Sequence, residues 1–201
     1  LHIHDRRQRQ MCIRDSLSGK QHIVLTDMNA DSDNVSVPMI LATAAVHSSL
    51  TRKGIRSFIS LHIQSAECLD THYFAVLIGV GATTVNPYLA QECIRERHSK
   101  GLFGDYSYEE CVARFKKAVD QGLLKIMSKM GISVVSAYRG GFNFEVGGLS
   151  RSMVNEYFLG VQSRISGIGL SGIEHKIKEL HKYAFSGDVA TLPIGGIYRY
   201  R

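Results

Sequence analysis

Between residue 20 and residue 97, short apolar runs alternate with longer stretches whose apolar residues recur every three or four positions. The short runs predict strands, at residues 22–26, 57–64 and 82–86. The helical stretches follow them, at residues 38–54, 65–78 and from 87 onward. Pro38 and Pro87 suit the first position of a helix, and Gly54 suits the end of one. The first run is apolar enough to predict a buried strand.

Strand and helix alternate three times, which is typical of parallel strands joined by right-handed helical crossovers. The predicted fold class is therefore α/β. In such sheets and barrels, functional groups gather beyond the carboxyl ends of the strands. The polar residues at those predicted ends are Asp27, Gln64, Glu67 and Asn86. Asp27 has two interpretations, a turn or cap residue and a catalytic acid, and the first is the commoner use of aspartate there.

The polar connection at residues 98–106 is the best candidate for a domain boundary. After it, Ser107 and Glu110 form a Ser-x-x-Glu capping box. An apolar stripe then predicts an amphipathic helix ending at Gly131, through Val112, Phe115, Val119, Leu123, Ile126 and Met130. The opposite side predicts a solvated face, with Lys117, Gln121, Lys125 and Lys129. Met127 and Met130 are expected to fill the core.

Beyond that helix the segments are rich in glycine and less regular. "SAYRGG" ends a strand-like run with Arg139 and two glycines, so a guanidinium projects from a tight turn. Arg139 could bind a carboxylate or phosphate, or pair within the protein. "SGIE", Ser171 to Glu174, predicts a second capping box. The helix that it opens would bury Ile173, Ile177 and Leu180.

Charge and cysteine content exclude several classes of protein. The formal charge of +6 comes from scattered basic residues, without the clustered footprint of a nucleic-acid-binding surface. No apolar run approaches the roughly 20 residues of a membrane-spanning helix. The four cysteines form no Cys-x-x-Cys pair, so we expect reduced thiols in a cytosolic protein and no metal site. Nucleotide-binding and nucleophile-elbow motifs are also missing.

The first 16 residues, "LHIHDRRQRQMCIRDS", match neither a secretory signal nor a folded element. They look like a non-native tail translated from a sequencing adaptor. From the residues alone, the chain is an α/β globular protein in two parts, without visible catalytic machinery.

Several long runs add a family resemblance. "VPMILATAAVHSSLTRKGIRS", "HYFAVLIGVGATTVNPYLAQE", "GLLKIMSKMGISVVSAYRGGFNFEVGGLS" and "YFLGVQSRISGIGL" resemble successive segments of the glutamate synthase large subunit, and the likeness continues to "IGGIYRYR". In that family a glutaminase domain releases ammonia. A central domain leads to an FMN-binding (β/α)8 barrel, where 2-oxoglutarate and ammonia give an imine that reduced flavin converts to L-glutamate. An iron-sulfur cluster passes electrons to the flavin.

The resemblance implies a division of this chain. Residues 17–97 would be the C-terminal part of a barrel-like central domain, 98–106 a linker, and 107–201 the mixed helical and loop entry into the FMN-binding barrel, which is incomplete here. Lys129, Tyr138 and Arg139 are then candidates for lining the flavin or substrate region. The loop "YRGGFNFEVGG" departs from the Tyr-Arg-Gly-Ala-Gln expected in the family, which leaves its role open.

The resemblance also implies that the glutaminase nucleophile and the cluster cysteines lie outside this chain. The fragment is therefore expected to be inactive alone, to bind no FMN or iron-sulfur cluster by itself, and to work in the cytoplasm. Its partners would be the remaining domains of the same polypeptide, with an NAD(P)H-dependent small subunit or ferredoxin as electron source. The alternative is a free-standing α/β scaffold or binding protein derived from the same family.

Overall fold

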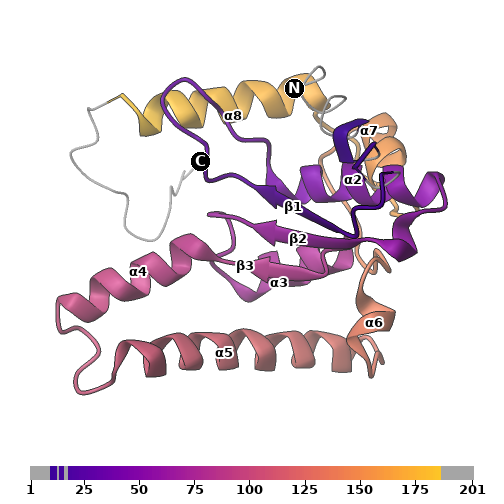
Figure 1. Ribbon diagram of the computed structural model, residues 1–201. Helices are drawn as coiled ribbons and strands as arrows, with labels where there is room; N and C mark the ends of the chain where they lie inside the picture. Colours follow the sequence, from indigo (N-terminus) through magenta and orange to yellow (C-terminus); the bar gives the residue numbers. More distant parts are fainter. Residues whose placement is uncertain (1–9, 13, 16–17, 187–201) are drawn as a thin grey trace.

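Three parallel strands, ordered in space as they are in the chain, form the sheet at the centre of the molecule (Figure 1). The computed structural model describes residues 10–12, 14–15 and 18–186. The strands are β1 (His22–Thr26), β2 (Ser60–Gln64) and β3 (Thr84–Asn86). The crossovers are α2 (Met39–Arg52) and α3 (Thr71–Gly79), with a short 3-10 turn at Arg56–Phe58. The predicted α/β class is confirmed, while the barrel-like closure stays a prediction.

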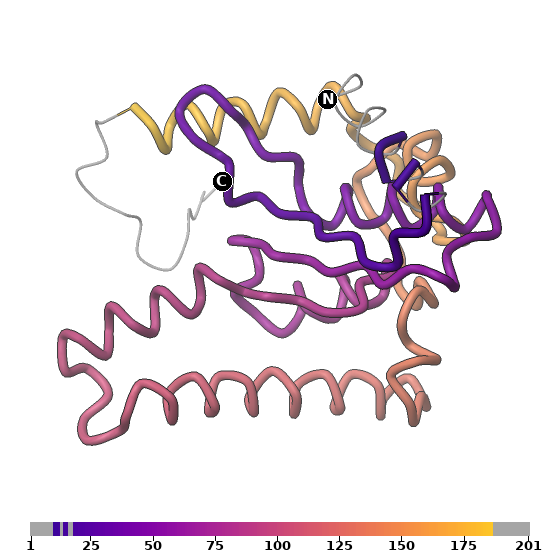
Figure 2. The backbone as a smooth tube through the Cα atoms, in the orientation of Figure 1, coloured from indigo at the N-terminus to yellow at the C-terminus, as the bar shows by residue number. Residues whose placement is uncertain are grey.

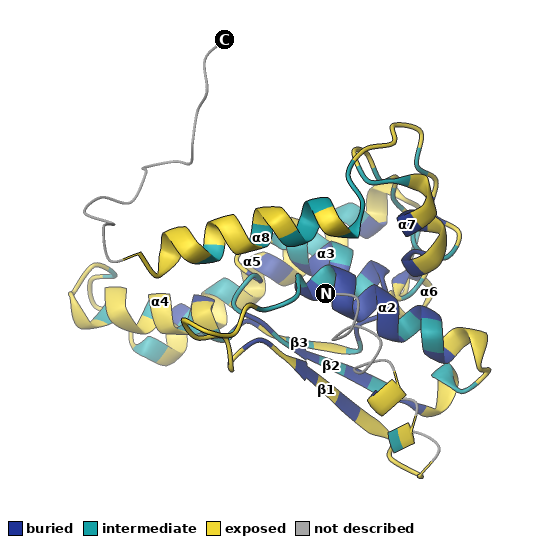
Figure 3. Ribbon diagram, turned by 90° about the horizontal axis from the view of Figure 1, so that it is seen from above, coloured by how far each residue is buried: buried dark blue, intermediate teal, exposed yellow. Residues whose placement is uncertain are grey.

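The two faces of the sheet differ in burial, as Figure 3 shows along the strands. Odd-numbered side chains such as Ile23, Leu61 and Ile63 are buried in the main core. Even-numbered side chains point the other way, and none of them is buried. Val24 is 60% exposed, so the prediction that the first strand is buried is wrong for one of its faces. Alternation with a period of two, hidden in a run of apolar letters, accounts for this.

Helix α2 is buried on most of its sides. Its alanines, Ala42, Ala44 and Ala45, are at most 7% exposed and allow close approach from both directions. One side packs toward the sheet, and the other packs against α7 (Arg151–Tyr157). Pro38 is the N-cap of α2 and not its first residue. The predicted end is confirmed, because the C-cap is Lys53 and Gly54 follows with a φ of +70°.

Helix α3 begins six residues later than the periodicity predicts. Residues 65–70 form a loop, and Asp70 caps the helix by accepting from the backbone N–H of Tyr73 at 2.8 Å. The side chain of Ser65 and the amide of Ala66 are instead bonded to Asp27, directly after the neighbouring strand β1. This tertiary hydrogen bonding overrides the local helical pattern, so the predicted start at Ser65 is wrong.

Helices α4 (Tyr88–Ser99) and α5 (Tyr108–Lys129) form an antiparallel pair (Figure 2), and α5 also packs on α3. The predicted capping box at Ser107 is confirmed, with both of its hydrogen bonds present. Gly131 has a φ of +70°, as the predicted left-handed cap requires. Met127 is buried as expected, but Met130 is 43% exposed because it lies past the last turn of α5. The predicted solvated face of α5 is exposed at all four positions.

The second half of the chain is more regular than its glycine content suggests. It contains α6 (Val135–Tyr138), α7 and α8 (Leu170–Ala184). The prediction of a strand before Arg139 is wrong, because the N–H of Arg139 donates to the carbonyl oxygen of Val135 at 2.8 Å and closes a helical turn. The prediction of a second capping box at Ser171 is also wrong, because α8 starts at Leu170 and Ser171 is already helical. Leu180 is 67% exposed, unlike the prediction.

The end segments complete the described structure. Of the predicted tail at residues 1–16, only 10–12 and 14–15 are described, and Cys12 among them packs in the main core. The "IGGIYRYR" run lies outside the described residues. None of the helices in the described part of the chain is both long and apolar enough to cross a membrane.

Candidate functional site

Asp27 lies at the carboxyl edge of the sheet, directly after β1, and is only 8% exposed. Its Oδ2 accepts from the hydroxyl of Ser65 at 2.7 Å and from the N–H of Ala66 at 3.0 Å. Tyr88, at the start of α4, also hydrogen-bonds to this carboxylate, and burial followed by this bond raises the pKa of Tyr88 to about 12. Asp27 therefore does more than hold a turn in its own loop, and its carboxylate is already hydrogen-bonded by the protein. It joins the ends of β1 and β2 to α4.

Glu67 forms the second polar junction on this edge. Its Oε2 accepts from the backbone N–H of Met39 at 2.9 Å, at the N-terminus of α2, and from the hydroxyl of Tyr73 in α3. A carboxylate at that position interacts favourably with the helix dipole and satisfies an otherwise unpaired N–H group. Burial, and then the bond to Glu67, raise the pKa of Tyr73 above its usual value. Glu67 therefore joins α2 to α3.

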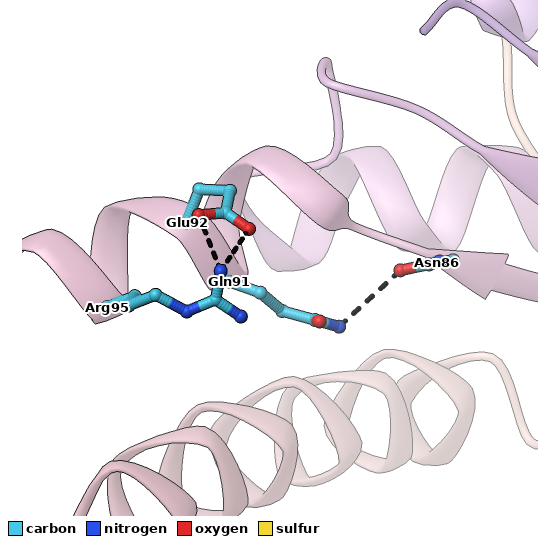
Figure 4. Close-up of polar contacts among 4 residues, drawn as sticks. All are labelled: Asn86, Gln91, Glu92 and Arg95. Atoms are coloured by element: carbon cyan, nitrogen blue, oxygen red, sulfur yellow. Dashed lines mark hydrogen bonds and ion pairs between the residues drawn. The ribbon is translucent and has the colours of Figure 1, made fainter.

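The other two predicted edge residues do not join this group. Gln64 lies on the uncovered face of the sheet, where its Oε1 accepts from the hydroxyl of Thr26 at 3.1 Å. Asn86 turns instead toward Gln91 on α4, at 3.5 Å (Figure 4). The exposed pair of Glu92 and Arg95 follows on the same helix, 2.7 Å apart. These contacts involve partly or fully exposed side chains, so they leave no enclosed site around Asn86.

A pocket of about 780 Å³ opens beside Asp27, between the loop after β1 and helix α8. The loop is held by Asp31, whose carboxylate accepts from both the backbone and the side chain of Asn34. These hydrogen bonds lower the pKa of Asp31. His181 on α8 donates to the carbonyl oxygen of Asp31 at 2.7 Å. The pocket wall is predominantly acidic, with Asp27, Asp31, Asp33 and Glu174 against the single basic side chain of Lys178, so its electrostatics do not favour an anionic ligand.

Neither a metal centre nor a nucleophile is assembled in the described part of the chain. No group of three or more His, Cys, Asp or Glu side chains there could hold a metal ion. None of the four cysteines, all of which are described, forms a disulfide bond. Cys68 lies closest to the edge site but is fully buried, and burial raises the pKa of its thiol to about 12. A thiol in that state is a poor nucleophile at neutral pH.

The three residues predicted to line a flavin or substrate region lie in three different environments. Lys129 is exposed on the solvated face of α5. Tyr138 is 3% exposed, and its hydroxyl donates to the carbonyl oxygen of Ala75 at 3.1 Å, which fixes α6 on α3. Arg139 is exposed and lines a separate pocket together with His47 and Arg56. The three do not converge on one cavity, so no flavin cradle is built from them, and their roles stay predictions.

The carboxylates at the sheet edge act as structural links, and this determines what the edge can do. Both Asp27 and Glu67 accept hydrogen bonds from groups on other elements. A general acid or base needs a proton-transfer position that faces a substrate, whereas the hydrogen bonds of these carboxylates are made to other elements of the protein. Sequence reasoning found Asp27 and Glu67 through their place after predicted strands. It missed Ser65 and Tyr73, which no local motif marks.

Comparison with known proteins shows which family this structure belongs to. Residues 7–150 match the family model described as the glutamate synthase central domain. The chain is 59% identical over 183 residues to the glutamate synthase [NADPH] large chain of Azospirillum brasilense, an alignment that covers 91% of this chain and 12% of that protein.

Two further relatives have different electron donors in their names. The chain is 41% identical to the ferredoxin-dependent glutamate synthase of Pyropia yezoensis, with coverage of 92% of this chain and 13% of that one. It is 32% identical to the glutamate synthase [NADH] of Saccharomyces cerevisiae, with coverage of 91% and 9%. The chain therefore spans about an eighth or less of the length of these relatives.

Proposed function

The chain belongs to the glutamate synthase family, and we propose that it is a scaffold segment of such an enzyme. The parent reaction would make L-glutamate from 2-oxoglutarate and glutamine-derived ammonia, by reduction of 2-iminoglutarate at FMN in the cytoplasm. When bound, FMN would supply the hydride for that reduction. The observation that carries this proposal is the 59% identity to a large chain over nearly the whole of this sequence.

The contacts at the sheet edge support a scaffold role over a catalytic one. Asp27 holds two strand ends and α4 together, and Glu67 holds α2 to α3. Each carboxylate is engaged by donors of the protein itself, which favours a structural role over proton exchange with a substrate. We infer that this part of the enzyme contributes rigid support, and that residues elsewhere in the polypeptide hold FMN and the iron-sulfur cluster.

The division between domains and the electron source belong to the same proposal. We keep residues 17–97 as the end of the central domain and 107–201 as the entry into the FMN-binding domain. The central-domain match runs from residue 7 to residue 150; it supports the central-domain part of this division and does not place the boundary at 98–106. The partner would be the rest of the polypeptide together with either an NAD(P)H-dependent small subunit or ferredoxin, since relatives of each kind match.

A segment exchange tests the proposal directly. Residues 18–186 replace the aligned segment in the Azospirillum brasilense large chain, and the chimera is assayed for glutamate formation from glutamine and 2-oxoglutarate, with its small subunit and NADPH. A chimera that keeps FMN and synthase activity supports the proposal. A folded chimera with full FMN content but no synthase activity would contradict it.

The isolated chain provides a second test. Incubated with FMN, glutamine, 2-oxoglutarate and a chemical reductant, the 201-residue chain should form no glutamate, because the described residues present neither an activated nucleophile nor a flavin cradle. Sustained glutamate formation would show that the assignment as a scaffold segment is wrong.

A further inference from the structure

A second pocket, of about 370 Å³, lies at the opposite end of the sheet from Asp27. Its wall includes Gln21, Ser60 and Thr83, which precede or begin the three strands. Two arginines, Arg56 and Arg139, face it, and none of the described residues that line it is acidic. Functional groups usually collect at the carboxyl ends of parallel strands, so a basic pocket at the amino ends is unexpected for a simple scaffold.

Arg56 is held in this pocket by neutral acceptors alone. Its Nε donates to Nδ1 of His47 at 3.0 Å, one Nη donates to the carbonyl oxygen of Ile59, and the other donates to the carbonyl oxygen of Gly81 at 2.6 Å. Among the described residues, no carboxylate lies within ion-pairing distance of it. A half-buried guanidinium normally has an anionic partner. Here the orientation is fixed in advance and the charge is left uncompensated.

His47 completes the arrangement. Its ring lies between Gly81 and Gly140: a Cβ added at Gly81 would lie 2.6 Å from the ring Cγ, and one added at Gly140 would lie 2.9 Å from Cε1. Both glycines have positive φ, at +115° and +71°. Because Nδ1 accepts from Arg56, the neutral ring carries its proton on Nε2. Burial, and then the charge of Arg56, lower the pKa of His47 to about 4, so the ring is neutral at pH 7.

Arg139 brings a second positive charge to the same pocket. It follows the single helical turn of α6, at an exposed position, and no described carboxylate pairs with it. After burial, the charge of Arg139 is the next cause that lowers the pKa of Arg56, so the two guanidinium groups repel each other. An anion between them would turn that repulsion into two attractive contacts.

We propose that this pocket binds a small oxyanion, a carboxylate or phosphate group, between Arg56 and Arg139. Guanidinium groups match the geometry of both anions through paired N–H donors. Arg56 supplies a fixed donor, because three hydrogen bonds already set its orientation. Arg139 supplies a second donor from the exposed rim of the pocket. This inference does not rest on the proposed function.

Calorimetric titration of the full 201-residue chain with inorganic phosphate, and separately with succinate, tests the proposal at low ionic strength. We expect saturable binding of at least one of the two, with a Kd below about 10 mM. Saturation by phosphate alone would identify a phosphate site, and saturation by succinate alone a carboxylate site. Absence of saturation by both would overturn the proposal.

Variants locate the binding. Arg139→Ala should weaken binding about 10-fold or more, the loss expected for one charge-assisted hydrogen bond, while circular dichroism shows an unchanged fold. Lys117→Ala is the matched control, because it removes one positive charge from the solvated face of α5. Arg139→Lys, which keeps the charge and loses the fork, should fall between the two. Equal binding by wild type and Arg139→Ala, or an equal loss in Lys117→Ala, would refute the site.

Discussion

Replacing Gly81 by alanine should destabilise the chain far more than the same replacement at Gly54. Both glycines have positive φ, +115° at Gly81 and +70° at Gly54. Their surroundings differ: an added Cβ meets nothing within 4 Å at Gly54, whereas at Gly81 it lies 2.6 Å from Cγ of His47 and closer still to Nδ1. Gly54→Ala therefore measures the backbone cost of a left-handed φ alone, and Gly81→Ala adds the cost of displacing the ring to that of a positive φ.

The magnitudes follow from the contacts. A positive φ costs an alanine about 1–2 kcal/mol, which is the whole effect expected at Gly54. At Gly81 the ring of His47 must also move, and Gly140 limits its movement on another side. Overpacking of this kind costs about 1–3 kcal/mol, and losing the bond from Arg56 to His47 costs about 1 kcal/mol more. We expect a total of about 3–6 kcal/mol for Gly81→Ala.

Urea unfolding followed by circular dichroism measures the free energy of unfolding of both variants. In thermal unfolding, the melting temperature should fall by about 2–4 °C for each kcal/mol in a chain of this size. The double variant Gly81→Ala/His47→Ala supplies the critical control, since removing the ring should restore part of the stability lost in Gly81→Ala. If Gly81→Ala is no less stable than Gly54→Ala, or if the double variant recovers nothing, the account of a confined His47 is wrong.

Three further outcomes are expected from other parts of the structure. Asp27→Ala should cost about 2–4 kcal/mol in urea unfolding because it leaves buried donors without an acceptor, whereas exposed Asp33→Ala should change stability by less than about 0.5 kcal/mol. Relative to His47→Gln, the wild type should keep its full free energy of unfolding above pH 6.5 and lose up to about 3 kcal/mol of it as the pH falls toward 4. The reason is that only the imidazole of the unfolded chain takes up a proton between these pH values. Unfolding curves of both proteins recorded between about pH 4 and pH 7 should show the difference. Alkylation at about pH 8, followed by peptide mass spectrometry, should modify exposed Cys93 and leave buried Cys68 unmodified until the chain unfolds, and equal rates would contradict the burial of Cys68.

The features predicted correctly from sequence depend on neighbours close in the chain. The capping box at Ser107 and the left-handed cap at Gly131 each involve contacts within a few residues. The order of strands and crossovers also follows from local periodicity. Where the pattern failed, a distant partner decided the outcome: Asp27 lies 38 positions from Ser65 and draws residues 65–70 out of the helix.

The carboxyl edge of the sheet and the basic pocket at its other end also differ in how far the sequence predicts them. Residues at the carboxyl ends of strands can be found from strand prediction alone, so the sequence indicates Asp27 and Glu67 without indicating their partners. The basic pocket has no comparable signal, because Arg139 lies far along the chain from His47 and Arg56, and a single arginine before two glycines does not reveal which residues it meets. Its assembly depends on α6 being helical, the reverse of what the strand-like run predicts.

The contacts that form the sheet and those that hold α2 on α7 differ greatly in sequence separation, which sets the order in which the chain can fold. The sheet is closed by contacts across 38 positions, as between Thr26 and Gln64, and across 22 positions, as between His62 and Thr84. The bond from Ser48 to the carbonyl of Tyr157 spans 109 positions, and closing that longer loop costs about 1 kcal/mol more entropy than closing one of 38. During synthesis the strands can pair before α7 has left the ribosome. Until it arrives, the alanine-rich side of α2 remains open to solvent and to any chaperone that binds apolar surface.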